Sequence, residues 1–559
     1  MRKIRGVVLV GGLVIFAGCG ESGSSFLEAL LGTDASTGEY IADGLSEYEG
    51  QEGGGADASL SVDSETGEGD LDGDSSSESG DCSEVYEITS SDLTGDVNWS
   101  CGTYRIAKDL RITDGTLTVA PCTTIEMSEG SDIKSSNGGR FVFEGAEECP
   151  IVLTSQLDNP YPGAWEFVSV GESSQNPSIF RYVHILYAGE KDPALTVSSG
   201  TKVILTNSRI EYSGTHGLSL KNSAELVECK DNVFANNEGA PVEAHVNSAG
   251  QLGEGVYEPN GTNKILLKGG AMERSATWIN NGIPYVVDAD FDVKGEGEGV
   301  ILTLDAGVEI QFEEGSELDV QQGGTIIAEG TADAPVVLRS FMGADSSPGD
   351  WDGVVLSDGV NRLDHVRIEF ADDSGVYIKS DAKLAMNHTT VQYSSGVGVR
   401  ALGELLEFSD NTLVDNGSVG LSVVPPGMGN IGKGTYSPNG KSGILVESNV
   451  LEPTKIYKDM VIQDQGVPYV MLRGLDISGE GETVTVTLEE GVTLRMGSNQ
   501  SIEGTGGGNL RIKGTLENPV TITSTLDSPT PGDWNHMYFK DAGETVFEHV
   551  DVVSVGLDL

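Results

Sequence analysis

Short runs of alternating apolar and polar residues recur along the chain from about residue 86 to its last residue. Gly, Asn, Asp and Ser separate these runs, which include Leu117-Thr118-Val119, Ile125-Glu126-Met127, Phe141-Val142-Phe143 and Ile151-Val152-Leu153-Thr154. Alternation with a period of two over a few residues is typical of half-buried strands. Because no helical periodicity of useful length appears in this region, we predict an all-β fold.

The strand-like runs return at a nearly constant interval. In three pairs of equivalent positions, the two residues are separated by the same number of residues: Cys122 and Cys149, Gly307 and Ala334, and Gly491 and Asn518. In two pairs of Asn residues that precede strands, the separation is slightly smaller: Asn207 and Asn232, and Asn387 and Asn411. About three strands in such a period match one coil of a parallel β-helix, whose coils stack ~4.8 Å apart. We therefore predict a right-handed parallel β-helix over residues 86–559, with a ladder of Asn side chains along the stack.

A longer unit of roughly 185 residues is superimposed on the coil. Pro162-Gly163-Ala164-Trp165 returns as Pro348-Gly349-Asp350-Trp351 and as Pro531-Gly532-Asp533-Trp534, at nearly equal spacings. The third copy lies shortly before Leu559, so we expect an incomplete third unit whose end is covered by more chain or by another chain. Because Trp occurs in every copy, we interpret these residues as core markers and not as sugar-binding platforms.

Two further motifs recur in the same units. Gly282-Ile283-Pro284-Tyr285 matches Gly466-Val467-Pro468-Tyr469, and Tyr257-Glu258-Pro259-Asn260-Gly261 matches Tyr436-Ser437-Pro438-Asn439-Gly440. With these motifs the chain resembles the right-handed parallel β-helix repeat lipoproteins of bacteria, in the pectate-lyase-like fold class. The resemblance covers about 85% of the chain and is specific for the fold. It implies little about activity, because this fold hosts lyases, hydrolases, adhesins and structural rods.

The N-terminus is typical of a lipoprotein signal peptide, which we assign to residues 1–18. A basic segment and a short apolar stretch end at Phe16-Ala17-Gly18-Cys19, which resembles a lipobox. Lipid chains on Cys19 would anchor the protein stably to a membrane. Since Gly20 and not Asp follows Cys19, we expect a lipid-anchored protein of the outer membrane, at the cell surface. The alternative is an ordinary secretory signal with an incidental Cys.

Residues 19–85 are rich in Gly, Ser, Asp and Glu, which predicts a disordered acidic tether. The net charge of the chain is −54, and no Lys or Arg occurs between Gly6 and Tyr104. Asp70-Leu71-Asp72-Gly73-Asp74 is similar to the first half of a calcium loop, but Ser75 follows where Gly is required. We interpret that motif as acidic low complexity. Because Lys and Arg are not clustered, we expect no nucleic-acid partner.

Five Cys residues follow the lipobox. Positions one coil apart would lie one above the other, within the ~4.4–6.8 Å Cα range of a disulfide, so we predict a Cys122–Cys149 bridge. A Cys82–Cys101 bridge would join the end of the tether to the first coil, and Cys229 would remain a buried thiol. We predict no metal site and no cofactor, because C-x2-C spacing is absent and the chain has only 7 His.

Polygalacturonase-type hydrolases use carboxylates that are clustered within a short stretch of chain. Asp372-Asp373, Thr215-His216-Gly217 and Arg511-Ile512-Lys513 are fragments of their pattern in the wrong order. The fragments are spread over about half of the chain, so we interpret them as coincidence. Pectate lyases need a calcium-binding Asp cluster and a basic residue beside it, and no cluster of Lys or Arg is evident.

Several His residues occupy positions that the repeat also fills with other residue types. The aligned sets are His365 and His549 with Tyr182, and His184 with Arg367 and Asp551. A surface site unique to the first unit could combine His216 with Glu211 and Glu225, or use residues 231–238. The simpler interpretation is solvated turns, and we predict no catalytic residue.

These patterns predict a non-catalytic lipoprotein anchored in the outer membrane through Cys19, with a β-helical rod for adhesion, glycan binding or envelope structure. Its partners would be the membrane and a polysaccharide or another surface protein. The alternative is a carbohydrate-active enzyme, either a polysaccharide lyase or a glycoside hydrolase. A cleft with two carboxylates within ~5–10 Å of each other would favour that alternative.

Overall fold

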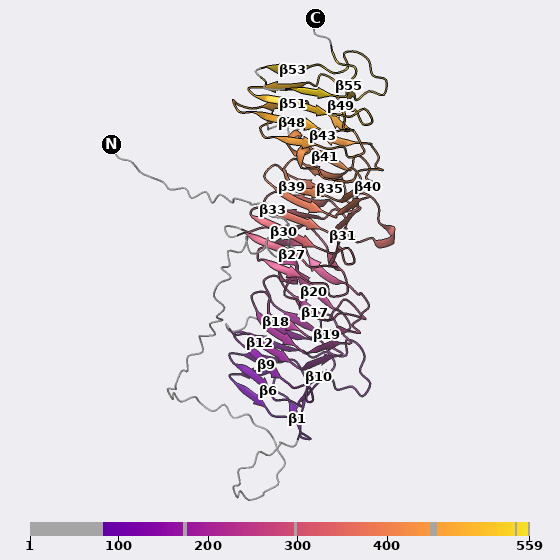
Figure 1. Ribbon diagram of the computed structural model, residues 1–559. Helices are drawn as coiled ribbons and strands as arrows, with labels where there is room; N and C mark the ends of the chain where they lie inside the picture. The colour runs from indigo at the N-terminus through magenta and orange to yellow at the C-terminus, as the bar shows by residue number, and fades with distance from the viewer. Residues whose placement is uncertain are drawn as a thin grey trace, which may run out of the picture. The chain divides into compact units, whose positions relative to one another are not determined.

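The computed structural model describes residues 82–171, 176–295, 299–447, 455–540, 542 and 545–556. Within these ranges, strands from successive coils pair in parallel and form long sheets (Figure 1). The predicted fold class, an all-β right-handed parallel β-helix, is confirmed. The predicted signal peptide, and the predicted tether up to residue 81, lie outside the described residues. The first strand begins at Val85.

In the first part of the chain, each coil contributes one strand to each of three sheets, and two of these sheets are confined to that part. Sheet 1 consists of β1 (Val85–Ile88), β4 (Thr103–Ile106), β7 (Thr124–Met127), β10 (Ile151–Ser155), β13 (Val183–Leu186), β16 (Arg209–Glu211), β19 (Asn232–Ala235) and β21 (Gly255–Val256). Sheet 3 consists of β3 (Val97–Trp99), β6 (Thr116–Val119), β9 (Arg140–Glu144), β12 (Ser178–Arg181), β15 (Lys202–Thr206) and β18 (Glu225–Lys230).

Sheet 2 has 15 strands among the described residues and continues from the first part of the chain into the second. It consists of β2 (Asp92–Thr94), β5 (Leu110–Thr113), β8 (Ile133–Ser136), β11 (Val168–Val170), β14 (Leu195–Val197), β17 (Leu218–Leu220), β20 (Val242–His245), β22 (Ile265–Lys268), β25 (Tyr285–Val287), β28 (Glu309–Phe312), β31 (Val336–Ser340), β34 (Val366–Glu369), β37 (Thr390–Gln392), β40 (Asn411–Val414) and β42 (Gly434–Thr435).

Two further sheets begin in the second part of the chain. Sheet 4 consists of β23 (Gly270–Met272), β26 (Phe291–Val293), β29 (Glu317–Val320), β32 (Gly353–Leu356), β35 (Ser374–Ile378), β38 (Val397–Ala401), β41 (Leu421–Val423), β43 (Ile444–Val446), β46 (Tyr469–Met471), β49 (Thr493–Met496), β52 (Val520–Ser524) and β55 (Val550–Val552). Sheet 5 consists of β24 (Ala276–Trp278), β27 (Val300–Leu304), β30 (Gly324–Glu329), β33 (Val360–Asp364), β36 (Lys383–Asn387) and β39 (Glu404–Ser409).

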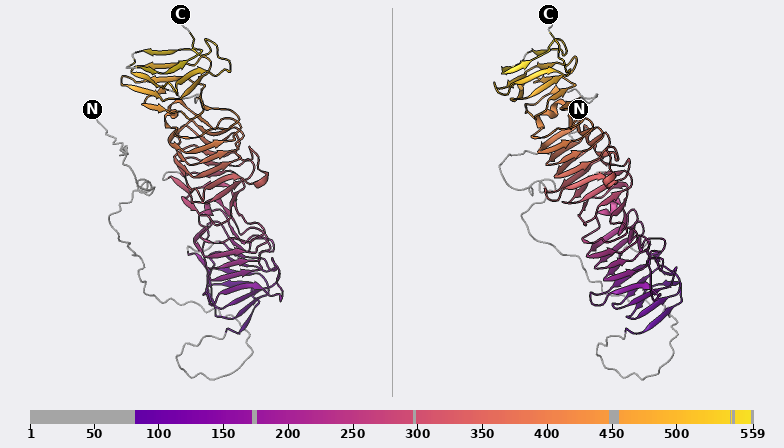
Figure 2. Two further views of the ribbon diagram at one scale, coloured as in Figure 1. Left: turned by 45° about the vertical axis from the view of Figure 1, so that its right-hand side comes forward. Right: turned by 90° about the vertical axis from the view of Figure 1, so that its right-hand side faces the viewer.

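The last two sheets have four strands each in the described part of the chain. Sheet 6 consists of β44 (Lys455–Ile456), β47 (Leu475–Ser478), β50 (Ile502–Thr505) and β53 (Met537–Lys540). Sheet 7 consists of β45 (Met460–Ile462), β48 (Val484–Leu488), β51 (Gly508–Lys513) and β54 (Val546–Glu548). From both directions of Figure 2 the coils follow one another in chain order.

The long repeat corresponds to 21 strands, since β7, β28 and β49 hold equivalent positions. We call β1–β21 the first unit, β22–β42 the second and β43–β55 the third. The equivalent strands β7, β28 and β49 belong to sheet 1, sheet 2 and sheet 4. Each unit therefore begins one sheet further around the coil than the unit before it.

Short helices mark the two places where one unit passes into the next. Helix α2 (Val246–Ala249) follows β20, and the 3-10 helix η2 (Pro425–Asn430) follows β41, each in the place of a third strand. Another 3-10 helix, η1 (Gly343–Asp345), lies in the loop after β31. Among the described residues, no helix is long and apolar enough to cross a membrane.

The predicted residue interval between successive coils is correct for hydrogen-bonded positions in the turns. In the strand that follows such a turn, the residues that pair are one residue further apart in the sequence. The backbone N–H of Cys122 donates to the carbonyl of Cys149, and the pairs Gly307–Ala334 and Gly491–Asn518 are joined in the same way. In the next strand Thr124 pairs with Val152 and not with Ile151. Coil length varies widely elsewhere, because loops of different length leave the stack between strands.

The three Trp residues of the Pro-Gly-x-Trp copies are buried, as predicted for core markers. Trp165, Trp351 and Trp534 are at most 1% exposed. Each indole N–H donates a 2.8 Å hydrogen bond to a carbonyl one coil later, that of Leu186, Glu369 or Val553 respectively. Their repeated presence is therefore explained by packing and by a satisfied buried donor.

The predicted ladder of Asn side chains is wrong in its positions. Asn207 lies in a turn with φ of +52°, whereas the amide oxygen of buried Asn232 accepts from the backbone N–H of Ser208. Asn–Asn contacts occur after the first strand of the coil instead: the Asn237 amide donates to Asn260 at 2.9 Å. The second unit repeats this contact between Asn416 and Asn439 at 3.1 Å.

Candidate functional site

A shallow groove of about 520 Å³ runs along the edge between sheets 1 and 2 in the first unit. Its lining comes from five successive turns, those after β7, β10, β13, β16 and β19. We call it the corner groove. The polar side chains that line it are Glu129, Tyr161, Glu166, Glu190, Lys191 and Glu238.

Glycines keep the floor of the corner groove low. Gly163, from the first Pro-Gly-x-Trp copy, has a φ of +79°, which only Gly adopts without strain. A Cβ atom at Gly163 would lie 3.2 Å from the Cα of Glu190, and one at Gly214 would lie 3.0 Å from the Cα of Gly163. The loop therefore folds down onto the next two coils, and the groove stays open above it.

The charged groups of the corner groove are close together. The Lys191 ammonium lies 3.1 Å from a Glu190 carboxylate oxygen and 3.5 Å from one of Glu166. The Tyr161 hydroxyl donates a 2.9 Å hydrogen bond to Glu129. That bond raises the pKa of Tyr161, and the bond to Glu190 raises the pKa of Lys191. This surface can offer hydrogen-bond donors and acceptors to a polar chain such as a glycan.

The equivalent edge of the second unit is built differently. Gly349 has a φ of +97°, but the Asp372 carboxylate lies 3.3 Å from the place of a Cβ atom there. Asp372 accepts a 2.5 Å hydrogen bond from the hydroxyl of Ser395 in the next coil. The turn from β34 to β35 is also shorter than the turn from β13 to β14, which carries Lys191.

The predicted combination of His216 with Glu211 and Glu225 is not brought together. Glu211 lies on sheet 1 beside Arg209, and Glu225 lies on sheet 3 beside Lys202. His216 lies in the turn before β17, where its Nδ1 accepts from the backbone N–H of Ala240. Burial lowers the pKa of His216. Of the alternative run 231–238, Glu238 lines the corner groove.

The three hydrolase-like fragments also lie on separate elements. Asp372-Asp373 is in the turn between β34 and β35, His216 is in the turn before β17, and Arg511 to Lys513 lie on β51. No coil contains more than one of them, so the described residues hold no site of that type.

The structure joins Cys82 to Cys101 and Cys122 to Cys149, with Cα separations of 4.9 and 4.6 Å. Cys229 is a buried thiol, and burial raises its pKa. Its sulfur accepts a hydrogen bond from the Asn232 amide at 3.5 Å, which indicates a packing role. Cys19 and the predicted lipobox lie outside the described residues.

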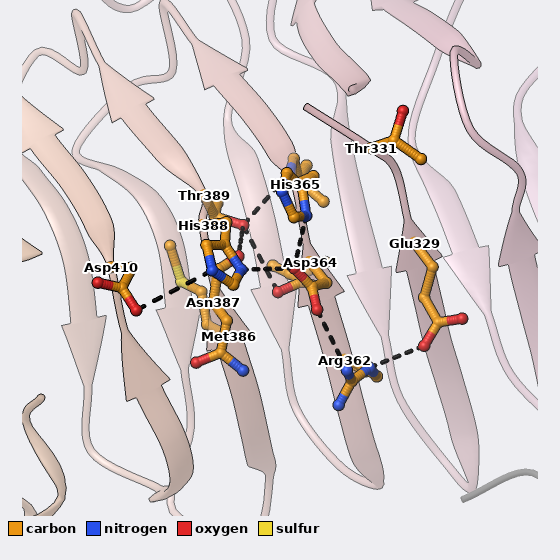
Figure 3. A network of polar contacts seen from close by, with 12 residues as sticks. Glu329, Thr331, Arg362, Asp364, His365, Met386, Asn387, His388, Thr389 and Asp410 are labelled. Atoms are coloured by element: carbon orange, nitrogen blue, oxygen red, sulfur yellow. Dashed lines mark hydrogen bonds and ion pairs between the residues drawn. The ribbon is translucent and has the colours of Figure 1, made fainter. Parts of the chain in front are cut away.

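One cluster of metal-ligating residues was missed by the sequence analysis. Ligand atoms of Asp364, His365 and His388 lie within 4.8 Å of one another (Figure 3). The alignment of His365 with Tyr182 and His549 was informative about the backbone, since the φ values are +50°, +50° and +45°. The alignment of repeat units did not show that His388 lies one coil after His365 and is therefore stacked on it. Two His residues separated by one coil length are the signal that could have revealed the cluster.

Comparison with known proteins identifies a family for part of the chain. Residues 270–383 match the family described as a pectate-lyase like beta helix domain. The matched stretch runs from β23 to the start of β36 and includes the second Pro-Gly-x-Trp copy. Searches among curated proteins and among solved structures find no match. Together with the parallel stack of strands, this match shows that the chain is a parallel β-helix protein that carries a pectate-lyase-like β-helix domain.

Proposed function

We propose that the protein is a non-catalytic lipoprotein of the outer membrane, held by lipid at Cys19, whose β-helical rod binds an uncharged glycan along the corner groove. The single observation that carries the binding function is the groove itself, which continues over five coils. At ~4.8 Å per coil, five turns give a polar track on the order of 20 Å long.

The chemistry of the groove favours a glycan as ligand. Carboxylates, an ammonium and a phenol lie along the track, and sugar hydroxyls can both donate to and accept from such groups. Tyr161 is 47% exposed, so a face of its ring is open to the apolar face of a sugar. A net charge of −54 disfavours acidic polysaccharides, so the favoured ligand is an uncharged one.

Glycoside hydrolysis is the second candidate, because Glu166 and Glu190 are close neighbours. A hydrolase needs a general acid and a second carboxylate on opposite sides of the scissile bond. Here both carboxylates contact the Lys191 ammonium, which would have to leave before a glycosidic oxygen could enter. This contact supports binding over cleavage.

Lipid attachment can be tested by growing cells with labelled palmitate. We expect the label and membrane association in the wild type and in Cys229→Ser, and neither in Cys19→Ser. Labelling of Cys19→Ser to the wild-type level would contradict the anchor.

Glycan binding can be tested on an array of uncharged and acidic glycans, followed by titration of the best ligand. The double variant Glu166→Gln with Glu190→Gln should weaken binding by about ten-fold or more, because two charged acceptors are lost. The matched control is Asp352→Asn with Asp372→Asn in the second unit, since the backbone N–H of Asp372 donates to the carbonyl of Trp351 as that of Glu190 does to Trp165. This control should leave affinity unchanged.

The same glycan should be recovered intact after long incubation with the wild-type protein. Chain shortening by the wild type that is lost in Glu166→Gln would replace the binding proposal with hydrolysis. Binding that is equally weakened by the control variant would show that the corner groove is not the site.

A further inference from the structure

We propose that Asp364, His365 and His388 form a site for a divalent transition-metal cation of the zinc type, on the surface of the second unit. The inference is independent of the glycan-binding proposal, since these residues lie at the edge between sheets 5 and 2 and not at the corner groove. Two imidazoles and one carboxylate are a ligand set that suits Zn²⁺, Ni²⁺ and Cu²⁺ better than Ca²⁺ or Mg²⁺.

Both imidazole rings present the same nitrogen to one carboxylate oxygen. His365 Nδ1 lies 2.8 Å from Asp364 Oδ1, and His388 Nδ1 lies 3.1 Å from that same oxygen (Figure 3). Ligand atoms around a tetrahedral Zn²⁺ with bonds of ~2.0–2.1 Å are roughly 3.3 Å apart. The two oxygen–nitrogen distances are therefore close to the spacing that one cation requires, and all three residues offer ligand atoms within 4.8 Å of one another.

The coil places the two rings one above the other. Each His is a single residue in the left-handed conformation directly after the last strand of its coil, with φ of +50° for His365 and +49° for His388. The rings stack with centroids 4.5 Å apart and an angle of 16° between planes. Buried Thr389 follows His388, and its backbone N–H donates to the buried Asn411 amide. This buried bond fixes the turn that carries the ligand.

Groups around the cluster orient the shared carboxylate. Arg362 Nη2 donates to Asp364 Oδ2 at 3.2 Å, which leaves Oδ1 to the two imidazoles. The charge of Arg362 is in turn balanced by Glu329 at 2.8 Å and Glu407 at 3.7 Å. Such outer contacts commonly fix the ligands of a metal site and raise its affinity.

The cluster is accessible to a cation from solvent. The side chains of Asp364, His365 and His388 are 21%, 30% and 48% exposed. Three protein ligands with an open side leave room for water or another small ligand in a fourth position. A cation here would replace the protons that the two imidazoles share with Asp364, and it would draw the two coils together.

The first unit provides a matched backbone without the ligands. Tyr182, Asn207 and Asp231 hold the same left-handed turns, with φ of +50°, +52° and +56°. Arg181 stands where the second unit has Asp364. The double variant His365→Tyr with His388→Asn therefore inserts residues that this turn already accepts, so it should fold normally.

The test is a titration of the complete protein with Zn²⁺ against a chromophoric chelator, in about 0.5 M NaCl with excess Mg²⁺ to suppress weak binding by exposed carboxylates. We expect about one equivalent of competitive binding in the wild type. His365→Tyr with His388→Asn should weaken it by about 100-fold or more, whereas Tyr182→Phe with Asn207→Asp in the first unit should not change it. Co²⁺ in place of Zn²⁺ should give visible bands that the first of these double variants lacks.

A transplant makes the test independent of a loss of folding. Arg181→Asp, Tyr182→His and Asn207→His together should raise the stoichiometry from about one equivalent to about two. Absence of competitive binding in the wild type, or equal binding in His365→Tyr with His388→Asn, would overturn the proposal.

Discussion

The first and second units share a backbone and differ in what that backbone displays. Tyr182 and Asn207 occupy the same left-handed turns as His365 and His388. In both units a buried side chain follows the turn, so the inner face is constant while the outer residue varies. The comparison teaches that the coil fixes positions in space and leaves their chemistry free to diverge.

The edge after the first strand of the coil shows the same division. In the first unit, the loop that ends at Trp165 opens the corner groove, with Lys191 between two carboxylates. In the second unit, the loop that ends at Trp351 faces the hydrogen bond between Asp372 and Ser395. The buried Trp is the constant part, and the polar residues around the loop are the variable part.

The largest expected effect comes from replacing the buried Trp that both units share. Trp165→Ala and Trp351→Ala should each lower the local free energy of unfolding by about 3–5 kcal/mol, because each removes a buried aromatic ring and leaves a cavity. Hydrogen exchange of the surrounding coils is the suitable measurement, since a repeat array need not unfold in one step. Exposed Tyr161→Ala is the control and should change exchange little. Markedly unequal effects of the two Trp variants would contradict a shared scaffold.

The next effect should be confined to one unit. Cys122 and Cys149 occupy positions that are Gly307 and Ala334 in the second unit, with the same backbone hydrogen bond. Replacing both cysteines with Ala should destabilise the neighbouring coils by about 2–4 kcal/mol, because the bridge no longer restricts the unfolded chain. Exchange in the second unit should stay at its wild-type rate. Faster exchange in both units would show that they unfold together.

A smaller effect should again be equal in both units. Asn232 and Asn411 each accept from a backbone N–H and donate to a carbonyl inside the stack. Changing either to Ala leaves two buried backbone groups without partners, which should cost about 1–3 kcal/mol. Asn207→Gly is the control, since Asn207 is only half-buried and Gly keeps the left-handed turn without strain. A stability loss for Asn207→Gly as large as that for Asn232→Ala would contradict this assignment.

The fold was predictable because its signals are periodic. The regular coil spacing, the Pro-Gly-x-Trp copies and the alternation within strands all follow from stacking, and each is visible in the sequence. The sequence did not predict that each unit begins one sheet further around the coil, because this shift depends on α2 and η2, each of which takes the place of a strand. The Asn ladder was misplaced because the left-handed turn puts Asn207 beside Asp231 and not beside Asn232.

The candidate sites were less predictable than the fold. The corner groove draws on five turns that are separated by whole coils, and no local motif announces such a surface. The cluster of Asp364, His365 and His388 was not predicted, because each His was compared only with the equivalent residues of the other units. In that comparison each His occupies a position that varies between units. Residues aligned between coils, and not only between units, would have placed His388 beside His365.

The smallest expected effect is a loss of local stability around His184 at acidic pH. Burial, with the charge of Arg209 as a second cause, lowers the pKa of His184 on sheet 1. Its equivalent in the second unit is Arg367, which stays charged at all relevant pH values. A His whose folded pKa is lowered binds fewer protons when folded than when unfolded. Stability is therefore complete above the unfolded His value of ~6.5 and declines as the pH falls below it.

Lowering the pH from 7.5 to 5.5 should therefore speed hydrogen exchange around β13 by less than about ten-fold. The variant His184→Arg copies the residue of the second unit and should remove this acceleration. His216 and His245 also have pKa values lowered by burial, so they should be changed to Asn in a second variant to isolate the effect of His184. Faster exchange around β13 at pH 7.5 than at pH 5.5, after correction for intrinsic rates, would reverse the sign expected from burial.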